Sequence, residues 1–133
     1  LTDTVGFIRQ MPKDLFAAFR ATFEEAADAD LIVEVVDVSD PEHTDHIATT
    51  SEVLRDLNLD DTPRLRVYNK VDKLSDDERF ALSNEPDSVS ISALDKSTTR
   101  TLLLRVESWL ALIAHQRRAR EAAAETERLL YEA

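Results

Sequence analysis

Cysteine is absent from this 133-residue chain, and glycine occurs only once, at Gly6. Without cysteine the chain can form neither a disulfide nor a thiolate metal site, so a cytoplasmic setting is expected. A single glycine also excludes the phosphate loops GxxxxGK(S/T) and GxGxxG, because each needs several glycines for close approach to a phosphate. No apolar run approaches the roughly 20 residues of a membrane span, so direct membrane contact is not expected.

The net charge is −11 at pH 7. This charge argues against broad binding to nucleic acid, because neutralising phosphates requires a basic face. The basic cluster Arg117, Arg118 and Arg120 is interspersed with glutamates, which indicates a solvated helix. The length and the 43% hydrophobic content fit one globular domain.

The apolar pattern predicts alternating helices and strands. Short β-branched runs predict strands at residues 31–38, 65–69 and 89–93. Helical periodicity predicts helices at residues 14–28, 41–57 and 76–84, and from Ser97 or Thr98 toward the C-terminus. Such alternation indicates a parallel sheet with helices on both faces and with ligands beyond the carboxyl ends of its strands. The strand at 31–38 is apolar on both faces except for Glu34, which the pattern does not explain.

Several helix details follow from the same patterns. Asp40 is expected to cap the second helix, with Pro41 as its first residue, and Ser75 to cap the third. In the last helix the residues expected to face the core are Leu102, Val106, Trp109, Leu110 and Ile113.

The motif NKVD follows the second predicted strand. The Asp72 carboxylate could accept two parallel hydrogen bonds from the ring N–H and the exocyclic amine of guanine, a pairing that adenine cannot offer. Lys70 could lay its aliphatic stem over the base, and Asn69 could brace neighbouring loops. The alternative is a polar turn after a strand.

Two weaker motifs flank NKVD. Ser92 and Ala93, in the tripeptide SAL, lie at the tip of the next predicted strand, where the Ala93 N–H could meet the guanine carbonyl. In DTVG, the carboxylate of Asp3 could hold magnesium and the amide of Gly6 could reach a terminal phosphate. Alone, SAL could be a helix cap and DTVG a simple turn.

His43 and His46 have a spacing that could place two imidazoles on one helix face. No third ligand is at hand, which favours an exposed, acidic first helical turn over a metal site.

In chain order DTVGFI, VVDVSDP, VYNKVD and SAL resemble the HflX family of ribosome-associated GTPases, in the translational-factor class of P-loop GTPases. The similarity covers about residues 1–113, and its most specific part is the run DTVGFIRQMPKDLFAAFRATFEEAADADL. By this resemblance Asp3 binds magnesium and Gly6 the γ-phosphate. The residues that would read or support guanine are Asn69, Lys70, Asp72, Ser92 and Ala93.

The resemblance implies an α/β fold with a partial P-loop NTPase-type parallel sheet of about three strands, helices on both faces, no P-loop strand and a long C-terminal helix. Residues 1–114 would be the C-terminal part of a GTPase domain and residues 115–133 a helical extension. The intact parent would bind GTP or GDP with Mg²⁺, hydrolyse GTP and act on the large ribosomal subunit. Phe7 stands where Ras-like enzymes carry a water-orienting glutamine, so slow intrinsic hydrolysis is expected.

The P-loop of the family would lie upstream of Leu1, so this chain is expected to be a fragment. Alone it should be inactive, hold no Mg²⁺ and bind guanine nucleotide with a Kd of about millimolar or weaker. The strand at 31–38 would keep an open edge, and pairing with a second copy is favoured over closure by residues 1–6. The other function considered is a non-hydrolysing interaction module derived from a GTPase fold.

Overall fold

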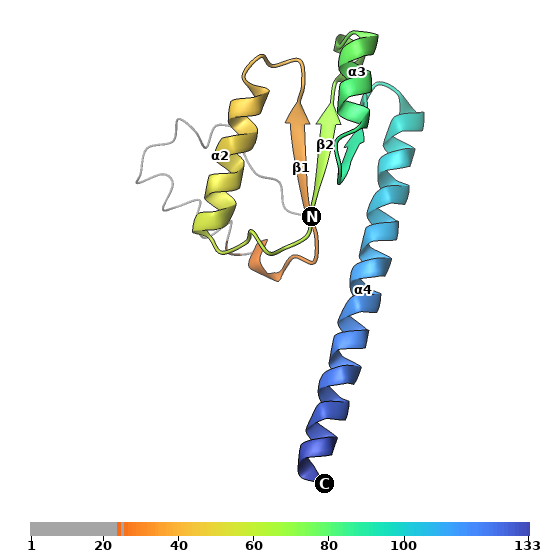
Figure 1. Ribbon diagram of the computed structural model, residues 1–133. Coiled ribbons are helices and arrows are strands. Elements are labelled where there is room, and N and C mark those ends of the chain that lie inside the picture. The colour runs from red at the N-terminus through yellow and green to blue at the C-terminus, as the bar shows by residue number, and fades with distance from the viewer. Residues whose placement is uncertain (1–23, 25) are drawn as a thin grey trace.

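The computed structural model describes residue 24 and residues 26–133 of the chain. Its centre is a parallel sheet of three strands in the order β1-β2-β3. The strands are β1 (Ile32–Asp37), β2 (Arg64–Asn69) and β3 (Ser88–Ser90), and Figure 1 shows β1 and β2 side by side. This sheet confirms the predicted α/β fold with three parallel strands.

Helices follow the strands in the predicted alternation. The α-helices are α2 (His43–Asp56), α3 (Asp76–Ser83) and α4 (Lys96–Glu132), and the 3₁₀ turns are η2 (Ala26–Asp28) and η3 (Val71–Lys73). The predicted helix at 14–28 falls mostly outside the described residues. Ser75 caps α3 as predicted: its side chain accepts from the Glu78 N–H, and the Glu78 carboxylate accepts from Ser75.

Apolar side chains form one core on each face of the sheet. On one face, Ile47 of α2 and Leu82 of α3 pack against a buried cluster formed by Val36, Val38, Tyr68 and Val71. On the other face, Leu102, Val106 and Trp109 of α4 pack against a buried cluster formed by Leu65, Val67, Val89 and Ile91. Helices therefore cover both faces of β2, the central strand.

β1 is covered less completely than the sequence predicted. Val33 and Val35 pair in register with Leu65 and Val67, so they point to the face on which α4 packs, yet they are 41% and 63% exposed. The prediction of cover on both faces of this strand is wrong for the α4 side, because α4 packs over β2 and β3. Glu34, which broke the apolar pattern, is buried. Its carboxylate accepts a hydrogen bond from Arg66 Nε at 2.9 Å, and this partner accounts for a charged residue inside the strand.

Three predicted boundaries were wrong by a few residues. α2 begins at His43 instead of Pro41, because the side chain of Asp40 accepts the Glu42 N–H in a turn ahead of the helix. β3 ends at Ser90 rather than residue 93. α4 begins at Lys96, capped by Asp95, whose carboxylate accepts the Ser97 N–H.

α4 runs without a break to Glu132, and its sequence contains neither proline nor glycine. Its 37 residues make a rod roughly 55 Å long, and Figure 1 shows its distal part extending well beyond the sheet. Leu110, predicted to face the core, is 41% exposed. In the described part of the chain, no helix has both the length and the apolar content needed to cross a membrane.

Candidate functional site

The loops that follow β2 and β3 lie side by side at the carboxyl edge of the sheet. Backbone hydrogen bonds extend the pairing past the ends of the strands, from the Ile91 N–H to Tyr68 O at 2.8 Å and from the Val71 N–H to Ile91 O at 3.2 Å. These bonds bring NKVD and SAL together although they are more than 20 residues apart in the sequence. The predicted site residues Asn69, Lys70, Asp72, Ser92 and Ala93 are therefore neighbours in space.

Asp72 and Ser92 connect the two loops directly. The Ser92 hydroxyl donates to Asp72 Oδ1 at 2.9 Å. Ser92 is buried, whereas Asp72 is exposed. The serine can thus fix the orientation of a carboxylate that still faces solvent, where it could accept hydrogen bonds from a ligand.

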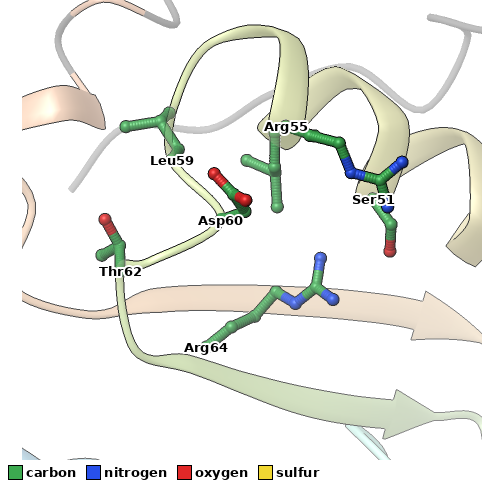
Figure 2. Close-up of a pocket in the computed structure, with 7 residues that line it drawn as sticks. Ser51, Arg55, Leu59, Asp60, Thr62 and Arg64 are labelled. Carbon is green, nitrogen blue, oxygen red and sulfur yellow. The ribbon is translucent and has the colours of Figure 1, made fainter.

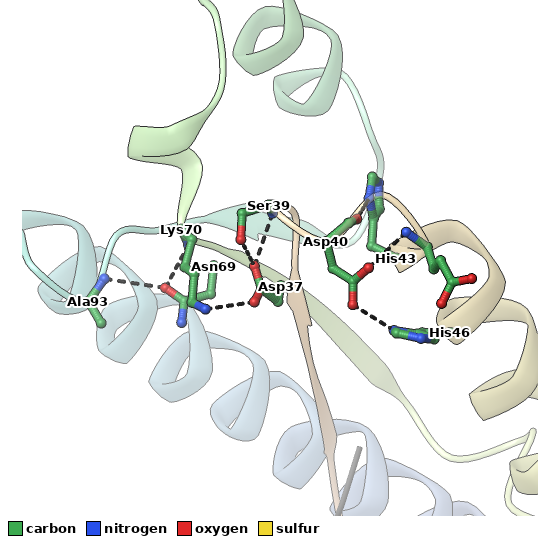
Figure 3. Close-up of polar contacts among 9 residues, drawn as sticks. Asp37, Ser39, Asp40, His43, His46, Asn69, Lys70 and Ala93 are labelled. Carbon is green, nitrogen blue, oxygen red and sulfur yellow. Dashed lines mark hydrogen bonds and ion pairs between the residues drawn. The ribbon is translucent and has the colours of Figure 1, made fainter. Parts of the chain in front are cut away.

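Asn69 makes a second link between the loops (Figure 3). Its Oδ1 accepts the Lys70 N–H at 2.8 Å and the Ala93 N–H at 3.3 Å. From the sequence, the Ala93 N–H was expected to donate a hydrogen bond to a guanine carbonyl. A guanine bound here would have to share that donor with Asn69. Asn69 therefore links the loop after β2 to the loop after β3.

Lys70 is held at both its backbone and its ammonium. Its φ of 66° and ψ of 32° lie in the left-handed region, which is unfavourable for a residue with a Cβ. Its Nζ donates to Asp37 Oδ2 at 2.7 Å (Figure 3). This hydrogen bond and the charge of Asp37 raise the pKa of Lys70, and the same hydrogen bond is the main cause that lowers the pKa of Asp37 to about 2.

Three residues at this edge were not found from the sequence. The Thr98 hydroxyl accepts the Ser92 N–H at 3.0 Å, and Arg79 Nε donates to Val71 O at 2.8 Å. Both fix the loops from α4 and α3, and their contacts depend on helix packing that no local pattern reveals. Asp37 had a usable signal, because it ends β1 at the same edge as Asn69.

The magnesium and phosphate residues of the prediction, Asp3 and Gly6, lie outside the described residues, as does Phe7. The two histidines of α2 lie near one aspartate: His43 Nδ1 is 2.8 Å from Asp40 O, and His46 Nδ1 is 3.7 Å from Asp40 Oδ2. Within the described residues there is no group of three or more side chains able to hold a metal.

A pocket of about 150 Å³ lies elsewhere, between the C-terminal end of α2 and the start of β2. Figure 2 shows that Arg55 and Arg64 both reach into it. It is lined by Ser51, Leu54, Arg55, Leu59, Asp60, Thr62 and Arg64. Because Arg64 begins β2 and Asn69 ends it, this pocket is at the opposite end of the strand from the predicted base-recognition residues.

Comparison with curated proteins gives consistent relatives. The chain is 52% identical over 82 residues to "GTPase HflX" of Akkermansia muciniphila, a match that covers 62% of this chain and 19% of that protein. It is 45% identical over 107 residues to "GTPase HflX" of Caldanaerobacter subterraneus, covering 80% of this chain and 24% of that protein. With "GTPase HflX" of Escherichia coli it shares 41% identity over 96 residues, or 70% of this chain and 22% of that protein.

The matches thus cover most of this chain, which spans about a fifth to a quarter of the length of these relatives. No protein-family profile matches the chain. The relatives agree with the resemblance found from DTVG, NKVD and SAL.

Proposed function

Because this chain corresponds to one part of an HflX-family protein, we propose that the carboxyl edge of its sheet recognises the guanine base of GTP or GDP. Asp72 accepts the two N–H groups of the base, Lys70 covers the ring with its aliphatic stem, and Ala93 donates to the base carbonyl. Asn69 and Ser92 hold these groups in place. Hydrolysis of GTP belongs to the whole protein, in which Gly6 contacts the γ-phosphate.

The observation that carries this proposal is the hydrogen bond between Ser92 and Asp72. A polar turn without a ligand needs no carboxylate held at the surface by a serine from the loop after another strand. Here the two motifs that the sequence singled out separately share one bond at 2.9 Å, and Asp72 is exposed. An oriented, solvent-facing carboxylate is what recognition of a guanine edge requires.

The Asp72→Asn variant tests the role of this carboxylate. Asparagine keeps one acceptor and gains a donor, so it matches the ring N–H and the C2 carbonyl of xanthine instead of the two donors of guanine. We expect the wild type to bind GMP more tightly than XMP or AMP, and the variant to prefer XMP over GMP by about tenfold. Amide shifts followed by NMR at millimolar nucleotide measure this, because base contacts alone give a Kd of about millimolar.

Asp60→Asn is the matched control, because Asp60 lines the pocket at the other end of β2. It makes the same change of charge and should leave the preference for GMP intact. A wild-type chain that binds GMP and AMP equally, or not at all at such concentrations, would refute the proposal.

Several further properties belong to the same proposal. In the whole protein Asp3 holds Mg²⁺, the large ribosomal subunit is the partner and the setting is cytoplasmic. Residues 1–114 form the C-terminal part of the GTPase domain, and residues 115–133 form a helical extension. Without the GxxxxGK(S/T) loop, this chain alone binds nucleotide weakly and does not hydrolyse it.

We also propose that the chain self-associates at the free edge of β1. In the described part of the chain β1 pairs only with β2, and Val33 and Val35 beside that edge are exposed. Unpaired strand edges with apolar side chains recruit other chains. Sedimentation velocity should show a dimer that Val35→Lys weakens; a monomer at all concentrations would contradict this.

The alternative of a non-hydrolysing interaction module is favoured by one feature, the exposed distal part of α4 with Leu129, Leu130 and Tyr131. The GMP titration separates the two functions, because a module without a nucleotide site would not bind GMP more tightly than AMP.

A further inference from the structure

Asp37 lies at the edge where the proposed base site is found, but the proposed function assigns it no task. It is the last residue of β1, and it pairs in register with Asn69, the last residue of β2. Strand pairing therefore places its side chain beside the loop that carries Lys70. It lies in the VVDVSDP run of the sequence, but its contact partner Lys70 is 33 residues away, so the sequence did not predict this pair.

Both oxygens of the Asp37 carboxylate have partners. Oδ1 accepts the Ser39 N–H at 3.0 Å and the Ser39 hydroxyl at 2.6 Å. Oδ2 accepts Lys70 Nζ at 2.7 Å. Since Ser39 holds one oxygen from its own loop, the other is directed at the lysine (Figure 3). The carboxylate is thus oriented before it meets the ammonium.

Lys70 is thereby restrained at its two ends. Its N–H is held by Asn69 Oδ1, its backbone lies in the left-handed region, and its Nζ is held by Asp37. A free lysine stem samples many rotamers, and each rotamer lost on binding weakens affinity. Fixing both ends limits the paths that the four-carbon stem can take across the carboxyl edge.

We propose that Asp37 is a positioning residue that holds the Lys70 stem in the orientation needed to cover the guanine ring. This inference rests on the proposed function, and Asp37 itself does not touch the base. The pair is half exposed, with side-chain exposures of 41% for Asp37 and 51% for Lys70, so its effect is modest. We expect about a three- to fivefold change in nucleotide affinity, from the lost restraint on one long side chain.

The test is NMR titration of the 133-residue chain with GMP and AMP. Asp37→Asn keeps an acceptor for Ser39 but removes the charge that holds Lys70, and it should weaken GMP binding about three- to fivefold. Asp40→Asn is the matched control: it makes the same charge change in the same loop, where Asp40 accepts the Glu42 N–H, lies near His46 and acts on Lys70 only through its charge, without a hydrogen bond. It should bind GMP as the wild type does.

A double-mutant cycle separates positioning from a general structural effect. If Asp37 acts through Lys70, then Asp37→Asn has no further effect on GMP binding in a Lys70→Met chain. An equal loss in both backgrounds, or no loss in Asp37→Asn, would overturn the inference while wild-type selectivity for GMP upheld the proposed function. Equal binding of GMP and AMP by the wild type would refute both.

The ligand-free chain provides a readout that does not depend on nucleotide. The Lys70 ammonium should give its own side-chain ¹H–¹⁵N signal at low temperature, because a held ammonium exchanges its protons slowly with water. Asp37→Asn should abolish that signal, and Asp40→Asn should keep it. Absence of the signal from the wild type would show that Lys70 is not positioned, whatever the titrations give.

Discussion

Two carboxylates of β1, three residues apart, form ion pairs with β2 or with the loop after it, and these pairs differ chiefly in how much water reaches them. Glu34 and Arg66 are 2.9 Å apart, with side chains 6% and 24% exposed. Asp37 and Lys70 are 2.7 Å apart, with side chains 41% and 51% exposed. The distances are similar, but the free energies of the two pairs differ, because burial determines the free energy needed to form an ion pair and to break it.

The Glu34 pair is part of the core on the α2 side of the sheet. A second arginine, Arg64, approaches Glu34 Oε2 at 3.7 Å, whereas Glu34 Oε1 is buried with no hydrogen-bond partner in the described part of the chain. Burial, the largest influence on the Arg66 guanidinium, opposes its charge, but hydrogen bonds and charge from Tyr68 and Glu34 together raise the pKa of Arg66. Removing one partner would leave a buried charge.

The Asp37 pair is at the carboxyl edge, where solvent screens it. Exposed pairs contribute about 0–1 kcal/mol to folding. The fold consequently depends little on Asp37, which leaves that residue free to serve a site. The inner pair is therefore part of the core, and we expect that altering the outer pair costs the fold little.

The largest expected effect comes from breaking the inner pair. Arg66→Met leaves the Glu34 carboxylate buried with only the more distant Arg64 as a partner. We expect a loss of about 2–4 kcal/mol in the free energy of unfolding, because an uncompensated buried charge is costly. Chemical denaturation followed by circular dichroism measures it.

Two variants sharpen this result. Arg64→Met removes only the partner at 3.7 Å and should cost less than Arg66→Met. Glu34→Leu combined with Arg66→Met removes both charges and should recover most of the lost stability, since apolar pairs replace buried ion pairs at little cost. If the double variant were no more stable than Arg66→Met, lost packing rather than the charge would explain the effect.

The smallest expected effect concerns the outer pair and pH. The pKa of Asp37 is about 2 in the folded chain, below the ordinary carboxyl value near 3.8. The unfolded chain therefore binds the proton more readily between these values, so this contribution is complete above about pH 4 and is lost as pH falls toward 2. After screening by solvent it amounts to less than about 1 kcal/mol.

Stability curves of the wild type and Asp37→Asn measure that contribution as a difference. The two curves should converge as pH falls from 4 to 2, and 1 M salt should reduce their separation at pH 7. A separation that persists unchanged at pH 2 would mean that Asp37 stabilises the chain by something other than its charge.

Local patterns predicted most of the fold. Three strands, the helices after them and the Ser75 cap could be read from the sequence, because β-branched runs, helical spacing and capping residues act over a few positions. The predicted start of α2 was wrong because the side chain of Asp40 forms a turn ahead of the helix. The predicted cover of β1 was wrong at Val35 because it depended on where a distant helix packs. Leu110 failed for the latter reason, since α4 continues past the sheet.

The candidate site divides in the same way. NKVD and SAL could be found from the chemistry of their side chains and their order, and parallel topology predicted that both would lie at the carboxyl edge. The sequence did not show which atoms of these two motifs would contact one another. The Ala93 N–H donates to Asn69, and Thr98 and Arg79 brace the loops, because the packing of α3 and α4 sets those distances.

From the sequence alone came the α/β class, the approximate elements and the residues able to recognise a purine, since each depends on side-chain chemistry and short-range spacing. Only the tertiary structure decided the partners of Glu34 and Asp37. The basic partners, Arg66 and Lys70, each lie more than 30 residues along the chain from the carboxylate with which they pair, and the parallel register of β1 with β2 brings them together. The place of each pair along that register also decided that the Glu34 carboxylate is buried whereas the Asp37 pair, at the carboxyl edge, faces water.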